Sequence, residues 1–255
     1  MAKITTKELL DAGVHFGHLT RKWDPQMAPF IFMEKNGIHI IDLKKSLKHL
    51  EEAAAALQGV VRSGRKVMFV ATKKQAKEVV EEQAKKLKMP YVTERWLGGM
   101  LTNFATIRKS LKKMTSIDKL LKEDAYNNLA KREKLMLSRE RAKLERVLGG
   151  IADLNRLPAA LFVVDIKREH IAIAEAQKLN IPVFAMVDTN SNPNEVDYPI
   201  PANDDAFKSI SLITNYLSDA MEAGLGERKK EREDSKIAEE AKRQKAEEVV
   251  VEKKD

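Results

Sequence analysis

The sequence has 255 residues, of which 43% are hydrophobic and 33% are charged. This is enough apolar material for a folded core, and it excludes a chain that is disordered throughout. The chain has no cysteine, which excludes disulfides, thiolate metal sites and cysteine nucleophiles and fits a cytoplasmic protein. No apolar run approaches the roughly 18 residues of a membrane span, so we expect neither export nor contact with a membrane.

Positive charge is concentrated in the N-terminal part of the chain. The formal net charge at pH 7 is +8. Residues 1–150 carry +14, residues 151–223 carry −6, and residues 224–255 are neutral. A folded protein with this distribution has a part that attracts phosphates beside a part that repels them. The pattern favours a polyanion as the partner of the first 150 residues.

The hydrophobic pattern predicts alternating strands and helices. The expected strands are 38–42, 67–71, 90–92, 161–165 and 182–188, and the expected helices are 43–62, 73–87, 169–179 and 205–222. Several strands are continuous apolar runs, which is typical of strands covered on both faces. Thr72 is the expected cap of the helix 73–87. Repeated βαβ units indicate an α/β, doubly wound fold with a mostly parallel sheet.

A long helical stretch interrupts this alternation. Apolar residues recur at helical spacing in two series, Phe104, Ile107, Leu111, Met114, Ile117 and Leu121, and then Leu137, Leu144, Leu148 and Ile151. Two antiparallel helices fit this pattern, with a turn near 123–128 and Gly149-Gly150 ending the second helix. Stripes this narrow are typical of the seam of a coiled-coil hairpin.

The remaining faces of the hairpin carry clustered cations. They are Arg108, Lys109, Lys112 and Lys113 on the first helix, and Arg139, Arg141, Lys143 and Arg146 on the second. Residues three and four apart are neighbours on a helix surface, so each group forms a patch. A merely solvated helix would mix charges of both signs more evenly. We expect the four cations of the first helix to contact the phosphates of a polyanion.

These elements divide the chain into three parts. We expect a discontinuous α/β domain formed by residues 1–103 and 150–223, with the coiled-coil hairpin 104–149 inserted into it. Residues 224–255 are rich in Lys, Glu and Ala and contain no aromatic residue. We expect this tail to be helix-prone but undocked, or disordered.

Motifs for nucleotide binding and catalysis are absent. The segment 59–66 reads G-x-x-x-x-G-R-K, but it precedes a strand and lacks the Lys-Ser/Thr pair of a P-loop. The sequence contains neither G-x-G-x-x-G nor a G-x-S-x-G nucleophile elbow. A doubly wound fold alone still allows a nucleotide-dependent enzyme, and a coiled coil allows an adaptor that binds only proteins. We expect a protein that is not an enzyme and uses no nucleotide cofactor.

Two irregular segments combine cations with an aromatic residue. Arg95 and Trp96 lie in a loop with two glycines, which lets a nucleic-acid backbone approach closely. Arg21, Lys22 and Trp23 form a second cluster, suited to phosphate contact with base stacking. In both cases the alternative stays open that the tryptophan is an anchor packed on the protein itself.

A further pair of cations follows the strand 67–71. Lys73 and Lys74 lie at the start of a helix, where free backbone N–H groups also favour an anion. This arrangement suits one backbone phosphate better than the polyphosphate of a nucleotide. We therefore include both lysines among the expected RNA contacts.

Histidine and aspartate residues also suggest a metal site. His15 and His18 are three residues apart, but the sequence has no H-E-x-x-H motif. Asp188 ends a strand and Asp204 and Asp205 open the last helix, so they could meet His18 at one edge of the sheet and bind a divalent ion. The alternative is that these residues serve as helix caps and hydrogen-bond partners. No cofactor is expected to be required.

Several long motifs resemble those of the bacterial members of the second small-subunit ribosomal protein family, S2. The matching runs are AGVHFGH at 12–18, RWLGGMLTN at 95–103, PAALFVVD at 158–165, EH at 169–170, IPV at 181–183 and DTN at 188–190. They occur in unbroken order and the similarity spans about residues 2–225. Only the tail lies outside it.

The resemblance implies a flavodoxin-like α/β domain with an inserted coiled-coil hairpin and no enzymatic activity. It implies a structural constituent of the 30S subunit that binds 16S rRNA and supports translation and subunit assembly in the cytoplasm. The implied partners are neighbouring small-subunit proteins and, in some bacteria, the OB-repeat ribosomal protein that captures messenger RNA. The RNA contacts named above follow from charge and position rather than from the family.

Overall fold

The centre of the molecule is a parallel sheet of five strands in the order β5-β4-β6-β7-β8. The computed structural model describes residues 4–121 and 130–251. The strands are β4 (Val67–Val70), β5 (Tyr91–Val92), β6 (Ala160–Val164), β7 (Val183–Val187) and β8 (Tyr198–Pro201). The first strand of this series lies between the second and the third, which is the flavodoxin-like order. The predicted α/β, doubly wound class is confirmed.

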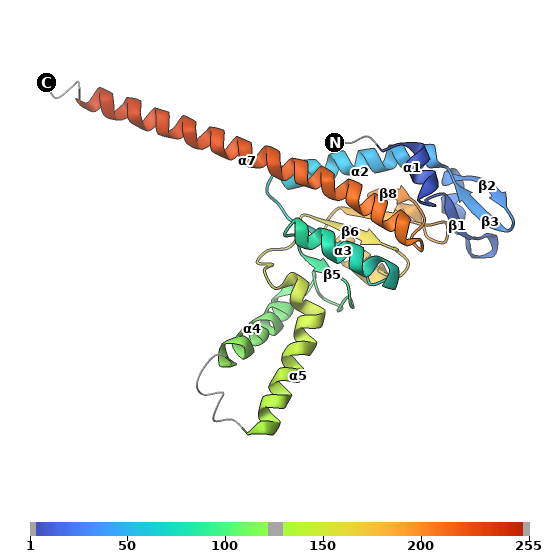
Figure 1. Ribbon diagram of the computed structural model, residues 1–255, viewed down its shortest axis with the longest axis horizontal. Coiled ribbons are helices and arrows are strands. Elements are labelled where there is room, and N and C mark those ends of the chain that lie inside the picture. The colour runs from blue at the N-terminus through green and yellow to red at the C-terminus, as the bar shows by residue number, and fades with distance from the viewer. Residues whose placement is uncertain (1–3, 122–129, 252–255) are drawn as a thin grey trace.

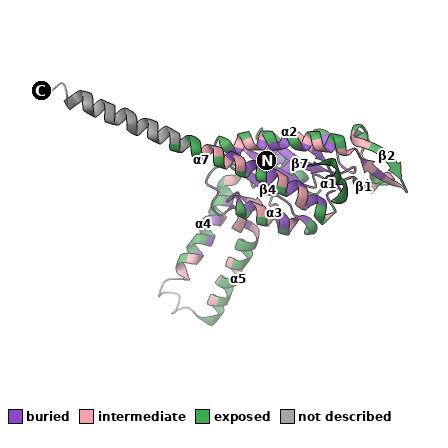
Figure 2. Ribbon diagram, turned by 45° about the horizontal axis from the view of Figure 1, so that its top comes forward, coloured by how far each residue is buried: buried purple, intermediate pink, exposed green. Residues whose placement is uncertain are grey.

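Helices cover both faces of the sheet (Figure 1). α2 (Leu43–Arg62), α3 (Lys74–Lys86) and α7 (Phe207–Val251) pack on one face, and α6 (His170–Lys178) and the base of the helical hairpin pack on the other. Neighbouring strand residues point to opposite layers, so Phe69 belongs to the first and Met68 and Val70 to the second. Figure 2 shows the buried residues concentrated in and around this sheet.

A second sheet is formed near the N-terminus, after the short helix α1 (Thr6–Asp11). Its antiparallel strands are β1 (Phe16–Leu19), β2 (Ile31–Lys35) and β3 (Ile38–Ile41), in the order β1-β3-β2. The expected strand 38–42 is β3, and it pairs in this antiparallel sheet rather than in the parallel one. The cause is the Asn36-Gly37 turn, whose φ angles of 55° and 71° fold β2 back onto β3 as a hairpin.

Thr72 does not cap α3 as predicted. The capping residue is Lys73, and it makes no side-chain hydrogen bond to the helix. The Thr72 backbone N–H instead donates to the Glu169 carboxylate at 2.9 Å, and the Thr72 hydroxyl donates to the same oxygen. Glu169 directly precedes α6 and is buried. Thr72 therefore joins the end of β4 to the start of α6.

The helical hairpin projects from the sheet (Figure 1). It consists of α4 (Phe104–Leu120) and α5 (Lys131–Leu148), and the predicted turn near 123–128 lies outside the described residues. The predicted seam of α4 is buried at Ile107, Leu111, Met114 and Ile117. Gly149 follows the last residue of α5 and begins a 3-10 turn, Gly149–Ile151. The division of the chain into domains remains a prediction.

The last helix is longer than the expected 205–222. α7 continues to Val251, so the part of the tail up to that residue is helical. Its first turns beyond residue 223 contact α2: the Gln58 amide donates to Glu227 at 2.7 Å, and Arg62 forms ion pairs with Glu227 (3.7 Å) and Glu231. The expectation of an undocked tail is therefore corrected for this part. Neither this helix nor any other in the described ranges is long and apolar enough to cross a membrane.

Candidate nucleic-acid interface

The first helix of the hairpin presents the predicted cluster of cations to solvent. Arg108, Lys109, Lys112 and Lys113 are all exposed, since the apolar positions between them form the buried seam. Lys113 forms an ion pair with Glu140 of α5. Within the described ranges the other three side chains have no carboxylate partner. Three cations of this cluster are thus available to a phosphate.

Two of the four predicted cations on α5 are less available, whereas Arg139 and Lys143 are exposed and have no carboxylate partner in the described ranges. Arg141 is paired with Asp118 of α4 and, at 2.6 Å, with Glu145 of its own helix. Arg146 lies 4.0 Å from the Glu94 carboxylate. Intramolecular pairs of this kind must be broken or shared before the guanidinium binds a phosphate. The α4 face is therefore the stronger candidate of the two.

Arg21, Lys22 and Trp23 lie together on the surface beside the small sheet. Arg21 and Lys22 belong to the 3-10 turn Thr20–Lys22, and both side chains are exposed. The Trp23 ring packs against the His39 ring, with 5.2 Å between their centroids, yet 40% of the residue remains exposed. Trp23 is therefore an anchor on the protein that still offers part of its surface for stacking.

Trp96 is a core residue, which corrects its predicted contact with RNA. Only 6% of its surface is exposed, and it packs with the layer beneath the hairpin. Its indole N–H donates to the Glu175 carboxylate at 3.1 Å. Arg95, the preceding residue, is exposed. The loop thus contributes one cation to the surface and one anchor to the interior.

Glu175, a buried residue of α6, holds the loop in place. Besides Trp96, its carboxylate accepts hydrogen bonds from the backbone N–H groups of Gly99 (2.7 Å), Leu101 (2.9 Å) and Thr102 (3.0 Å). Burial favours the protonated acid, but these hydrogen bonds outweigh it and lower the pKa of Glu175. The sequence analysis missed this residue. The signal was a glutamate on the otherwise apolar face of α6, between Ile173 and Ala176.

Lys73 is buried and surrounded by carboxylates, so its predicted contact with RNA is also corrected. Its ammonium lies 2.7 Å from Asp204, 2.6 Å from Asp205 and 3.4 Å from Asp165. Burial alone would lower the pKa of Lys73, but these charges raise it well above the usual value. Lys73 neutralises an acidic cluster of its own protein, whereas the adjacent Lys74 is exposed.

The four predicted metal ligands lie together at the carboxyl ends of the parallel strands. One ligand atom from each of His18, Asp188, Asp204 and Asp205 can be chosen so that all lie within 4.8 Å of one another. The His18 Nδ1 is 3.0 Å from Asp188, and its Nε2 is 3.4 Å from Asp205. The sequence analysis correctly predicted that these four residues meet at one edge of the sheet. It did not predict that Lys73 lies among them.

Protonation of this cluster follows from its burial and charge. Burial and the nearby carboxylates of Asp188 and Asp165 raise the pKa of Asp204 to about 7, despite its contact with Lys73. The hydrogen bond with Asp188 raises the pKa of His18, although burial opposes this. One oxygen of Asp204 is buried with no hydrogen-bond partner. The cluster can therefore accept either a proton or a cation.

Comparisons with known proteins agree with this architecture. The profile of a family described as "Ribosomal protein S2" matches residues 9–224, which is most of the chain. The chain belongs to the ribosomal protein S2 family. This confirms the resemblance noted in the sequence. The family is structural and not enzymatic, so the expectation that the chain is not an enzyme is also confirmed.

Curated relatives match the chain over nearly its whole length, and each is named small ribosomal subunit protein uS2. The protein of Cytophaga hutchinsonii is 69% identical over 244 residues, covering 96% of both chains. That of Christiangramia forsetii is 66% identical over 229 residues, covering 90% of this chain and 77% of its own. That of Parabacteroides distasonis is 61% identical over 241 residues, covering 94% and 87%.

Proposed function

We propose that this S2-family chain is a structural constituent of the small ribosomal subunit that binds 16S rRNA and supports translation and subunit assembly. It acts in the cytoplasm, where its cations neutralise phosphates and the rigid sheet fixes their positions. The proposed contacts are Arg21, Lys22, Trp23, Lys74, Arg95, Arg108, Lys109, Lys112 and Lys113. The observation that carries the proposal is the α4 face, where three of four exposed cations have no carboxylate partner in the described chain.

Binding of the purified chain to 16S rRNA should depend strongly on salt. If about five phosphates are neutralised, the logarithm of the association constant falls against the logarithm of the salt concentration with a slope of about −3.5 to −4.5. The measurement is filter binding over a series of potassium chloride concentrations. A slope near zero contradicts the proposed mechanism, and no binding to 16S rRNA contradicts the proposed function.

We also propose that neighbouring small-subunit proteins cover part of the N-terminal sheet. A hollow of about 520 Å³ lies between α1 and the small sheet, and its lining includes Leu10, Phe32 and Ile40. Phe32 is 69% exposed and Leu10 is 50% exposed. Large apolar side chains gathered in this way are typical of a protein contact. The OB-repeat ribosomal protein that captures messenger RNA is a further partner that we propose for the chain.

A structural divalent ion at His18, Asp188, Asp204 and Asp205 is the third proposal. The partnerless buried oxygen of Asp204 favours it, because a cation would satisfy this atom. One imidazole nitrogen and three carboxylate oxygens form a donor set that suits Zn²⁺. The ammonium of Lys73 competes for the same carboxylates, so the ion would share the cluster with this lysine.

Elemental analysis of the natively purified protein should find about one divalent ion per chain. Zinc added to the metal-free protein should raise its melting temperature, because an ion that binds only the folded state stabilises it. His18→Ala should abolish this increase, and His170→Ala, at an exposed histidine outside the cluster, should preserve it. A native protein without a stoichiometric ion contradicts the metal site.

A further inference from the structure

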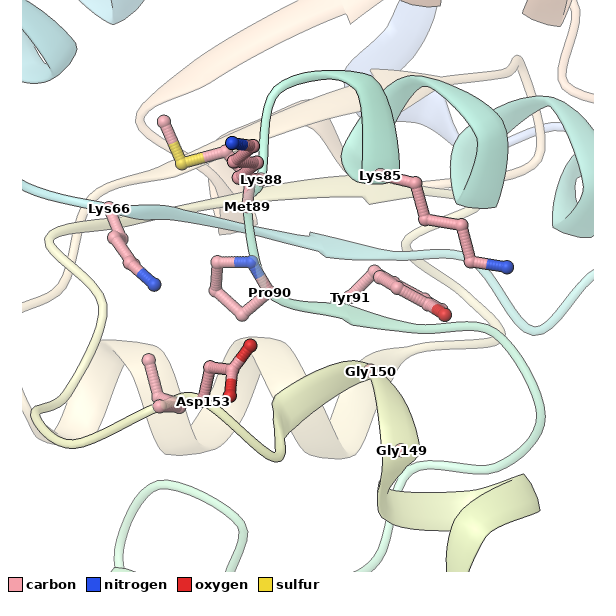
Figure 3. Close-up of a pocket in the computed structure, with 10 residues that line it drawn as sticks. Lys66, Lys85, Lys88, Met89, Pro90, Tyr91, Gly149, Gly150 and Asp153 are labelled. Atoms are coloured by element: carbon pink, nitrogen blue, oxygen red, sulfur yellow. The ribbon is translucent and has the colours of Figure 1, made fainter.

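A pocket of about 280 Å³ lies where the base of the hairpin meets β5, at the edge of the sheet. Figure 3 shows Pro90 and Tyr91 beside the Gly149-Gly150 turn. Three lysines also line the pocket, each from a different segment: Lys66 before β4, Lys85 near the end of α3, and Lys88 in the turn after α3. This is the amino end of β4 and β5, opposite the acidic cluster at the carboxyl ends of the strands.

The turn that carries Lys88 occurs twice in the molecule. The sequence KLKMP at 86–90 is repeated as KLNIP at 178–182. In the first turn the Met89 N–H donates to the Ala84 carbonyl at 2.9 Å, and in the second the Ile181 N–H donates to the Ala176 carbonyl at 2.9 Å. The φ angles of Lys88 and Asn180 are 53° and 54°. The two turns therefore have the same backbone and differ in their side chains.

The lysines of the first turn are not required by this backbone. Asn180 occupies the left-handed position in the second turn, and asparagine adopts that conformation more readily than lysine does. Gln177 stands where the first turn has Lys85. The charges at positions 85 and 88 are therefore specific to the turn beside the pocket, and Lys88 lies there in a conformation that disfavours a lysine. Such a local departure from the preferred residue is typical of a functional position.

Two of the pocket lysines are free to bind an anion. Within the part of the chain that the structure describes, neither Lys66 nor Lys88 forms an ion pair with a carboxylate. Lys85 is paired with Glu81 at 2.6 Å and lies 5.8 Å from the centre of the Tyr91 ring. Lys66 and Lys88 are thus the two cations of the pocket that are available to bind an anionic ligand.

The hairpin and the sheet hold the walls of this pocket at a fixed spacing. A Cβ atom on Gly150 would lie 2.2 Å from the Tyr91 carbonyl oxygen, so only glycine lets the two backbones approach this closely. The carboxylate of Asp153 also lines the pocket, and it adds a hydrogen-bond acceptor beside the lysines. A ligand that fits has both phosphate groups and hydrogen-bond donors.

We propose that this pocket binds the ribose-phosphate backbone of RNA, with phosphates at Lys66 and Lys88 and a ribose 2′-hydroxyl donating to Asp153. The inference rests on the proposed function and adds a contact that anchors RNA at the junction of hairpin and sheet. A bare phosphate ion supplies a single anionic group, whereas an RNA strand brings successive phosphates and a 2′-hydroxyl on one molecule. It is therefore a poorer ligand than an RNA strand.

The test compares a double variant with a control that has the same charge. Lys66→Gln with Lys88→Asn removes the two free cations, and the second change installs the residue of the repeated turn, so the melting temperature should not fall. Lys178→Gln with Lys208→Gln removes two exposed lysines that also lack a carboxylate partner in the described ranges. The probe is purified 16S rRNA, titrated by filter binding in potassium chloride and, at equal ionic strength, in potassium phosphate.

The K66Q/K88N variant should bind 16S rRNA about tenfold more weakly than the wild type, with a salt slope reduced in magnitude by about 2. The control should change affinity by less than about twofold. Wild-type binding should be the same in phosphate as in chloride, whereas specific competition by phosphate would indicate a site for the free ion and overturn the RNA assignment. If the wild type binds and the K66Q/K88N variant binds equally well, only the pocket proposal fails. If the wild type does not bind, the proposed function fails with it.

Discussion

Replacing Arg108, Lys109, Lys112 and Lys113 together by glutamate should reduce incorporation of the chain into small ribosomal subunits by about tenfold or more. The replacement converts four cations on one face of α4 into four anions, which repel phosphates where the original residues attract them. All four side chains are exposed and the seam residues between them are unchanged, so the hairpin should still form. The lost ion pair with Glu140 is exposed and contributes about 1 kcal/mol or less.

A matched control distinguishes the effect of the position of these cations on incorporation from the effect of the total charge of the chain. Lys167, Lys178, Lys208 and Lys229 are also exposed, and their replacement by glutamate changes the net charge by the same amount. Incorporation is measured as the amount of tagged chain that sediments with small subunits from cells expressing each variant. Equal incorporation of the α4 variant and this control would contradict the role of the hairpin.

Local patterns were sufficient to predict most of the fold. The strands β4, β6 and β7 are buried at every position, and continuous apolar runs with no polar alternation indicated this directly. The range of α2, Leu43–Arg62, agrees with the predicted helix because its apolar spacing and its end at Ser63-Gly64 are local signals. Strand pairing is not local. The partner of the strand 38–42 depends on the Asn36-Gly37 turn before it, which pairs this strand with β2 outside the parallel sheet.

The availability of individual cations could not be predicted from sequence. Lys73 and Lys74 are neighbours, yet one is buried against Asp204, more than a hundred positions further along the chain, and the other is exposed. Trp96 and Arg95 differ in the same way, because a buried carboxylate on α6 binds the indole. Charge patterns identify where cations occur in a sequence. Whether a cation faces a phosphate or a carboxylate depends on tertiary contacts between distant segments.

Replacing Glu175 by alanine should lower the free energy of unfolding by about 3–5 kcal/mol. The variant leaves two buried donors, the Trp96 indole N–H and the Leu101 backbone N–H, and two part-buried donors, the backbone N–H groups of Gly99 and Thr102, without their acceptor. Each unsatisfied buried donor costs about 1–3 kcal/mol, and the part-buried donors cost less because water can reach them. Glu175→Gln keeps one carbonyl oxygen and should lie between the alanine variant and the wild type. The measurement is urea unfolding at pH 7.

The pH dependence of the stability of the Glu175→Ala variant shows whether Glu175 stabilises the loop as a charged hydrogen-bond acceptor or only by packing. Because the pKa of Glu175 is lower in the folded state, its contribution is fully present above the unfolded value of about 4.3 and is lost as the pH falls through the folded value. The stability difference between wild type and Glu175→Ala should therefore shrink in acid.

Glu222→Ala, which removes an exposed ion pair with Lys86, is the control and should change stability by about 1 kcal/mol or less. A Glu175→Ala variant as stable as this control would show that the carboxylate does not hold the loop, and the position of Arg95 would need another cause.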